Sequence, residues 1–111
     1  MSKIKVAVNG YGVIGKRVAE AVQKQQDMEL VGICDVATDW RIKVAIVKRI
    51  PVYGFDQVTV GKMNEAGIST NGTLDELLAK ADIVVDCAPK KYGDQNAERY
   101  RQAGVKFIVQ G

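Results

Sequence analysis

Short β-branched runs alternate along the chain with longer stretches of helical periodicity, and this alternation limits the possible fold more than any other feature. It is typical of repeated β-α-β units, in which crossover helices join parallel strands. Strands are predicted at residues 4–8, 29–34, 51–53, 83–87 and 105–109. Helices are predicted at residues 14–24, 39–50, 57–66, 73–80 and 94–103. We therefore expect an α/β fold, with a doubly wound, mostly parallel sheet and helices on both faces.

Local markers support several of these boundaries. The first predicted helix carries one apolar stripe at helical spacing, which we expect to pack on the sheet and which consists of Ile14, Val18, Ala21 and Val22. Thr73 and Glu76 have the spacing of a capping box, which predicts the start of a short helix. Gly104 is placed to end the last helix.

The segment between Asp39 and Pro51 is open to two interpretations. Ile42, Val44 and Ile46 alternate as the residues of a half-buried strand do. Asp39 could instead cap a helix that Pro51 would stop. We favour the helix because parallel strands on either side need a crossover connection between them.

Composition places the chain among ordinary globular proteins. The 111 residues are 47% apolar and 26% charged, which suits a single domain. No apolar run approaches the roughly 20 residues that cross a bilayer, so we expect no membrane partner. The N-terminal residues lead directly into the first strand, without the features of a signal peptide. We therefore expect a cytoplasmic protein.

Charge and rare residue types exclude several functions. Sixteen basic and thirteen acidic residues give a net charge of +3 without a basic stripe, so no nucleic-acid partner is expected. The absence of histidine excludes catalysis by an in-chain Ser-His or Cys-His pair and a His-metal site. Cys34 and Cys87 are expected to be small buried residues that form neither a disulfide nor a metal site. Asp82 and Asp86 flank an apolar strand, and we assign them no chemistry.

A G-x-G-x-x-G motif, formed by Gly10, Gly12 and Gly15, follows the first predicted strand and opens the first helix. Gly10 would allow a tight turn with positive φ, Gly12 would let a pyrophosphate approach the backbone, and Gly15 would let the helix pack closely. Val13 and Ile14 would supply N–H groups at the helix N-terminus, where the helix dipole favours phosphate. In this context the motif predicts a Rossmann-like dinucleotide-binding fold.

Asp35 follows the second predicted strand, twenty residues after Gly15. An acidic residue at this place accepts hydrogen bonds from the adenosine ribose hydroxyls. Its charge would repel the 2′-phosphate of NADP, so we expect NAD as the cofactor. NADP remains the alternative, because Arg41 and Lys43 are near enough in sequence to contact a 2′-phosphate.

Ala88 and Pro89 follow the fourth predicted strand, at the carboxyl edge where open α/β sheets bind ligands. We expect both to flank the cofactor cleft, and Gly111 to lie at the same edge, where a missing side chain would let the cofactor pass. Lys90 and Lys91 are candidate phosphate contacts, although lysines in such a loop are usually solvated.

Three segments together resemble the archaeal type of glyceraldehyde-3-phosphate dehydrogenase. The first is VAVNGYGVIGKRVA at residues 6–19, the second DIVVDCAPKK at residues 82–91, and the third FIVQG at residues 107–111. Many dehydrogenases share the first segment, whereas the combination of all three is far more specific.

The resemblance implies phosphorylating, NAD(P)-dependent aldehyde oxidation in central carbon metabolism, by a protein that is a homotetramer when whole. It also implies cofactor contacts at Val13, Ile14 and Gly111. Many members carry Lys where this chain has Asp35, and such a Lys suits NADP, so this departure favours NAD.

The residues that would carry out the family's reaction are missing from this sequence. The thioester-forming Cys of the family lies in a Ser-Cys-Asn-Thr-Thr motif followed by a His base, and neither occurs here. We therefore expect residues 1–111 to be an NAD(P)-binding domain without its catalytic domain, inactive alone and a fragment of a longer reading frame. Two alternatives remain open: a stand-alone nucleotide-sensing regulatory module, and another dehydrogenase family such as homoserine or aspartate-semialdehyde dehydrogenase.

Overall fold

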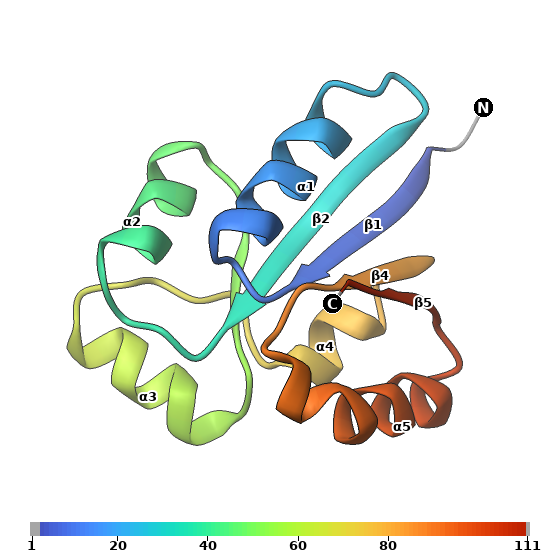
Figure 1. Cartoon of the computed structure of the whole chain (residues 1–111). Coiled ribbons are helices and arrows are strands. Elements are labelled where there is room, and N and C mark those ends of the chain that lie inside the picture. The colour runs from blue at the N-terminus through green and yellow to red at the C-terminus, as the bar shows by residue number, and fades with distance from the viewer. Residues whose placement is uncertain (1–2, 111) are drawn as a thin grey trace.

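Five parallel strands form one sheet in the order β3-β2-β1-β4-β5, as the computed structural model shows for residues 3–110 (Figure 1). The strands are β1 (Ile4–Asn9), β2 (Met28–Asp35), β3 (Val52–Gly54), β4 (Ile83–Asp86) and β5 (Lys106–Val109). The helices are α1 (Val13–Gln23), α2 (Trp40–Val47), α3 (Gln57–Glu65), α4 (Leu74–Leu78) and α5 (Gly93–Ala103). The predicted doubly wound fold is confirmed, and each of the four pairings between neighbouring strands is parallel.

Two apolar layers bury the two faces of the sheet. On one face, Ala19 of α1, Ile42 of α2 and Met63 of α3 pack against Val8 and Ile33 of the central strands. On the other face, residues of α4 and α5 pack against the sheet, and the buried set there includes Ala7, Leu74, Leu77, Val84 and Tyr100. The central strands β1 and β2 are therefore covered on both sides, as a parallel sheet requires.

The face that α1 presents to the sheet differs from the predicted stripe. Gly15, Ala19 and Val22 are buried, whereas Ile14 is 51% exposed and Ala21 is exposed. The prediction is confirmed for Val22, and for Val18, which packs partly buried against the core. It was wrong at Ile14 and Ala21, because small residues let the helix axis come close to the strands, which apolarity alone does not indicate. The helix is therefore turned so that Gly15 and Ala19 face the sheet together with Val22.

Residues 40–47 form a helix, so the crossover interpretation is confirmed, but α2 ends well before Pro51. The Asp39 side chain accepts the Arg41 N–H at the helix start, as predicted for a cap. At the other end Arg49 takes a left-handed conformation with φ 61°, and the Ile50 N–H bonds the Ala45 carbonyl at 3.0 Å. This Schellman closure, rather than the proline, stops the helix.

The other helices follow their markers with two differences. Thr73 and Glu76 form the predicted capping box, although α4 ends at Leu78 rather than near Lys80. Gly104 ends α5 in the left-handed region, as predicted. The segment Lys90–Tyr92, expected to be a loop, is a 3₁₀ turn (η1) that leads directly into α5.

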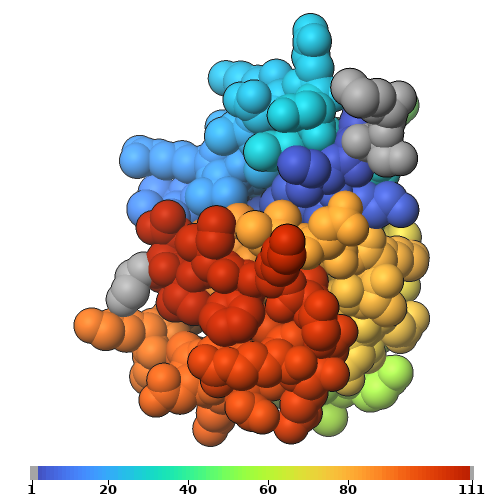
Figure 2. Space-filling view, turned by 90° about the vertical axis from the view of Figure 1, so that its right-hand side faces the viewer, coloured from blue at the N-terminus to red at the C-terminus, as the bar shows by residue number. Residues whose placement is uncertain are grey.

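Strand β5 lies at one edge of the sheet, and its Ile108 and Val109 are 50% and 47% exposed. Figure 2 shows the red and orange atoms of β5 and α5 forming much of the surface on that side. None of the helices within residues 3–110 has the length and apolarity needed to cross a membrane.

Candidate dinucleotide-binding edge

The carboxyl ends of β1 and β4 lie side by side, and the chain leaves them toward opposite faces of the sheet (Figure 1). After β1 it enters α1, and after β4 it enters η1 and α5. This is the topological switch point at which open α/β sheets bind ligands. A groove of about 810 Å³ opens here, lined by the loops after β1, β2 and β4 and by the start of α5. Its volume falls within the usual range of ligand pockets, about 300–1,000 Å³.

Two glycines of the motif are required by the packing of the turn itself. Gly10 has φ +100°, and a Cβ there would lie 2.7 Å from the Cys87 carbonyl carbon and the Ala88 nitrogen. A Cβ on Gly15 would lie 1.8 Å from the Gly10 carbonyl oxygen. The structure therefore confirms the positive φ of Gly10 and the close packing at Gly15 that the motif predicts.

Gly12 has a different environment from its two neighbours. Its φ is −83°, which any residue can adopt, and a Cβ there would meet no atom within 4 Å. Gly12 lines the groove, and the exposed residues Val13 and Ile14 follow it as the first residues of α1. The first N–H groups of a helix have no acceptor within the helix, so these amides can bond a ligand. The structure thus gives no packing reason for glycine at position 12 and leaves room for a ligand beside it.

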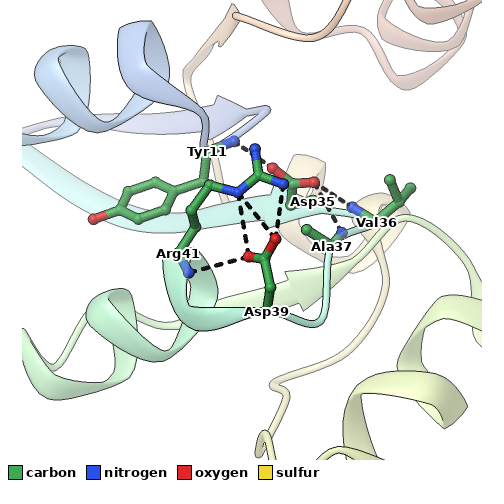
Figure 3. Close-up of polar contacts among 6 residues, drawn as sticks. All are labelled: Tyr11, Asp35, Val36, Ala37, Asp39 and Arg41. Atoms are coloured by element: carbon green, nitrogen blue, oxygen red, sulfur yellow. Dashed lines mark hydrogen bonds and ion pairs between the residues drawn. The ribbon is translucent and has the colours of Figure 1, made fainter.

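Three backbone N–H groups hold the Asp35 carboxylate in place (Figure 3). Its Oδ2 accepts the Tyr11 N–H at 2.6 Å, and its Oδ1 accepts those of Val36 at 2.6 Å and Ala37 at 3.0 Å. The first bond ties the end of β2 to the glycine turn. Since a carboxylate has about four acceptor positions, Oδ2 keeps one for a ribose hydroxyl.

Arg41 lies beside this carboxylate but pairs with another one. Its guanidinium bonds both oxygens of Asp39, with the shortest contact at 3.0 Å (Figure 3). These hydrogen bonds lower the pKa of Asp39 and raise the pKa of Arg41, to which the nearby charge of Asp35 also contributes. A phosphate bound here would compete with two carboxylates for Arg41.

The end of β4 is supported by a buried network that the sequence analysis did not identify. Tyr100 donates its hydroxyl proton to Asp86 Oδ2 at 2.5 Å and accepts the Asn9 side-chain N–H at 2.8 Å. The other oxygen of Asp86 accepts the Ala88 N–H at 2.9 Å. Asp86 is 1% exposed, so the expectation that it has no chemistry missed a structural role in shaping the groove.

The structure places the remaining candidates at different points. Ala88, Pro89 and Lys91 line the groove, whereas Lys90 is exposed and Gly111 lies outside the described residues. The roles proposed for these residues stay predictions.

Neither cysteine is placed for metal or disulfide chemistry. Cys34 is fully buried, and burial raises the pKa of its thiol. Cys87 is half-buried, lines the groove and also has its pKa raised by burial. The expected burial is confirmed for Cys34, whereas Cys87 is only half-buried. Both are free thiols, and residues 3–110 contain no cluster of metal-ligating side chains.

Tyr11 gives a stability prediction. Its ring packs in the core, and its hydroxyl is buried without a hydrogen-bond partner in residues 3–110, which raises its pKa. An unsatisfied buried hydroxyl costs about 1–3 kcal/mol. We expect Tyr11→Phe to raise the melting temperature by roughly 4 °C or more, as measured by circular dichroism. A lower melting temperature would show that the hydroxyl has a partner in solution.

Comparison with known proteins identifies the family. Residues 4–110 match the family model described as dihydrodipicolinate reductase, N-terminus. The glyceraldehyde-3-phosphate dehydrogenase of Archaeoglobus fulgidus is 51% identical over 112 residues, covering 100% of this chain and 33% of that protein. The enzyme of the same name from Pyrococcus furiosus is 48% identical over 109 residues, covering 98% of this chain and 33% of that protein. The chain therefore spans about a third of the length of these relatives, at their N-terminal end.

Solved structures confirm the fold. GenD2 from gentamicin A biosynthesis, in complex with NAD, superposes with a TM-score of 0.72 at 23% identity and covers 98% of this chain and 27% of its own. The apo scyllo-inositol dehydrogenase of Lactobacillus casei gives 0.67 at 19% identity, with 99% and 28% covered. At these identities the likeness establishes a Rossmann-like fold alone.

The family model and the sequence relatives go further than the fold, because each matches nearly the whole chain. They confirm the resemblance that the three sequence segments indicated. The chain thus belongs to the dihydrodipicolinate reductase N-terminus family of NAD-binding domains, and archaeal glyceraldehyde-3-phosphate dehydrogenases are among its relatives.

Proposed function

We propose that residues 1–111 form the dinucleotide-binding domain of a phosphorylating, NAD-dependent glyceraldehyde-3-phosphate dehydrogenase. The observation that carries this proposal is the geometry at Gly12, where no packing requires glycine and the first N–H groups of α1 begin. The diphosphate would lie against Gly12, Val13 and Ile14, and the adenosine ribose against Asp35. Ala88 and Pro89 would form the opposite wall of the groove. Gly10 and Gly15 would allow the close backbone packing of the turn on which the diphosphate site depends.

The polar contacts around Asp35 favour NAD over NADP. A 2′-phosphate would be placed beside the charges of Asp35 and Asp39, and Arg41, the nearest cation in this group, is already paired with Asp39. Bringing like charges together is unfavourable, more so in a groove than in open water. We therefore propose NAD as the preferred cofactor.

The experiment is a thiol-protection titration with NAD. Cys87 lines the groove, whereas Cys34 is fully buried, so labelling of the native chain should occur at Cys87 alone. We expect millimolar NAD to slow the labelling of Cys87 severalfold and to shift the amide NMR signals of residues 10–15, with a weaker effect of NADP. Cys34, which should react only on unfolding, reports any loss of structure. Unchanged labelling and unchanged NMR signals at millimolar NAD would contradict the proposal.

The whole protein is proposed to be a cytoplasmic homotetramer that oxidises its aldehyde through a Cys thiolate of a further domain. A bound nicotinamide would supply the hydride acceptor for that reaction. This chain's residues would bind and orient the dinucleotide, so the chain alone should show no aldehyde oxidation.

A stand-alone nucleotide-sensing module is the second candidate, because residues 9–96 of this chain line the groove and a single Rossmann-like domain can serve as a binding protein. The gene sequence after codon 111 separates the candidates. A continuation into Gly-Glu-Lys and a later Ser-Cys-Asn-Thr-Thr supports the dehydrogenase, whereas a stop codon supports the sensing module.

A further inference from the structure

Asn96 is a buried polar residue whose side chain has no hydrogen-bond partner among residues 3–110. It is 2% exposed, and no hydrogen bond within residues 3–110 involves its side-chain amide. The Tyr11 hydroxyl is the one polar side-chain atom in this part of the chain that is both inaccessible and unpaired. Asn96 itself is among the residues that line the groove. Burying an amide without a partner is costly, so a partner in the groove would explain it.

Helix α5 carries Asn96 beneath the carboxyl edge of the sheet. Near Asn96 along the helix, Tyr100 bonds Asn9 at the end of β1. Arg99 donates to the Phe55 carbonyl, after β3, at 3.2 Å, and its guanidinium lies 4.7 Å from the centre of the Phe55 ring. These contacts place α5 beneath the end of β1 and beside the segment that follows β3.

Asn96 lines the same groove as Gly12 and Asp35, where the proposed function places the diphosphate and the ribose. With the diphosphate at Gly12 and the ribose at Asp35, the base continues away from Gly12 toward β3. Phe55 and Tyr92 line the groove there and offer aromatic surface to a planar ring. Asn96 lies in the same groove, on the helix beneath.

The chemistry of the asparagine amide fits one base in particular. Adenine presents a donor at N6 beside an acceptor at N7, and the side-chain amide of Asn presents the complementary acceptor and donor. We propose that Asn96 is a specificity-determining residue, whose side-chain amide pairs with the adenine edge of the dinucleotide. The inference rests on the proposed function and adds the residue that selects the base.

The test compares NAD with nicotinamide hypoxanthine dinucleotide, in which an oxygen replaces the N6 amino group. The parent chain should bind NAD about tenfold or more tightly than the hypoxanthine analogue, as measured by calorimetry, because the analogue places an acceptor opposite the amide oxygen. Asn96→Ala should bind both dinucleotides with nearly equal, weaker affinity. Asn96→Asp has nearly the same shape but no N–H for N7, so it should also lose about tenfold for NAD.

Asn64→Ala is the matched control, since it removes the same side chain from the exposed side of α3 and should keep the tenfold preference. Melting curves of each variant establish that it folds. The comparison of NAD with the hypoxanthine analogue in the parent chain does not depend on any variant. Equal affinity of the parent for both dinucleotides would overturn the inference and leave the proposed function intact. If the parent bound neither dinucleotide, both this inference and the proposed function would be wrong. If folded Asn96→Ala kept the tenfold preference for NAD, Asn96 would not be the residue that selects the base.

Discussion

Gly15→Ala is expected to lose a large part of the protein's stability, whereas Gly12→Ala should fold like the parent and lose NAD binding. At position 15 the added Cβ would lie 1.8 Å from the Gly10 carbonyl oxygen, an atom that the glycine turn holds against β4. Backbone must therefore move, at a cost of about 3–5 kcal/mol. Domains of this size are stable by only about 5–15 kcal/mol, so this cost is a large fraction of the total.

At position 12 the added Cβ meets nothing within 4 Å, so the cost should stay near or below 1 kcal/mol, the usual effect of alanine at a helix N-cap. The same methyl group would stand where the diphosphate approaches the backbone. We expect the NAD dissociation constant to rise at least tenfold, which corresponds to about 1.4 kcal/mol. Urea denaturation and calorimetry measure the two effects separately.

Gly61→Ala is the matched control for this pair. Gly61 lies on the exposed side of α3, away from the groove, and a Cβ there also meets nothing within 4 Å. Alanine in a helix interior should stabilise the protein by about 0.5–1 kcal/mol and leave NAD binding unchanged. If Gly12→Ala bound NAD as tightly as this control, the diphosphate would have to lie elsewhere.

The parts of the fold that local patterns specify could be predicted from the sequence. The alternation of strands and helices, the glycine turn at Gly10 and the capping box at Thr73 each depend on residues close together in the chain. Short-range patterns of this kind also placed Asp35 at the carboxyl end of the second strand, although it is the last residue of β2 rather than the residue after it. Its hydrogen bond with the Tyr11 N–H could not be foreseen, because Tyr11 is 24 positions away in the chain.

The rest depends on contacts between distant segments. Asn9 bonds Tyr100 across 91 positions, so nothing in the sequence near Asp86 indicates that its carboxylate will be buried with a partner. In the sequence, Asn96 likewise looks like an ordinary polar helix residue, because its burial depends on how α5 packs against the sheet. Two of the four residues predicted for the buried side of α1, Ile14 and Ala21, are exposed for a related reason, since the closeness of Gly15 to Gly10 depends on how helix and turn pack.

Tyr100→Phe is expected to destabilise the protein by about 2–4 kcal/mol. The phenol ring would still fill its place beside Phe107, where the ring centres are 5.3 Å apart. However, the Asp86 carboxylate and the Asn9 amide would each lose a partner in a buried environment, and a buried group without a partner costs about 1–3 kcal/mol, more when charged. Urea denaturation measures the loss. Tyr92→Phe, at an exposed tyrosine, should change stability by less than about 0.5 kcal/mol.

The pH dependence distinguishes the lost hydrogen bonds from a mere packing defect. Burial and the hydrogen bond to Asp86 raise the pKa of Tyr100 above its ordinary value of 10.0. The folded protein therefore keeps this proton at pH values where the unfolded chain releases it, so the contribution of Tyr100 is complete below pH 10 and decreases above it. Tyr100→Phe has no proton to lose at this position. The stability difference between the parent and Tyr100→Phe should thus be constant from pH 7 to 9 and shrink above pH 10. A difference that stayed constant to pH 11 would mean that the hydroxyl ionises as easily in the folded state as in the unfolded one.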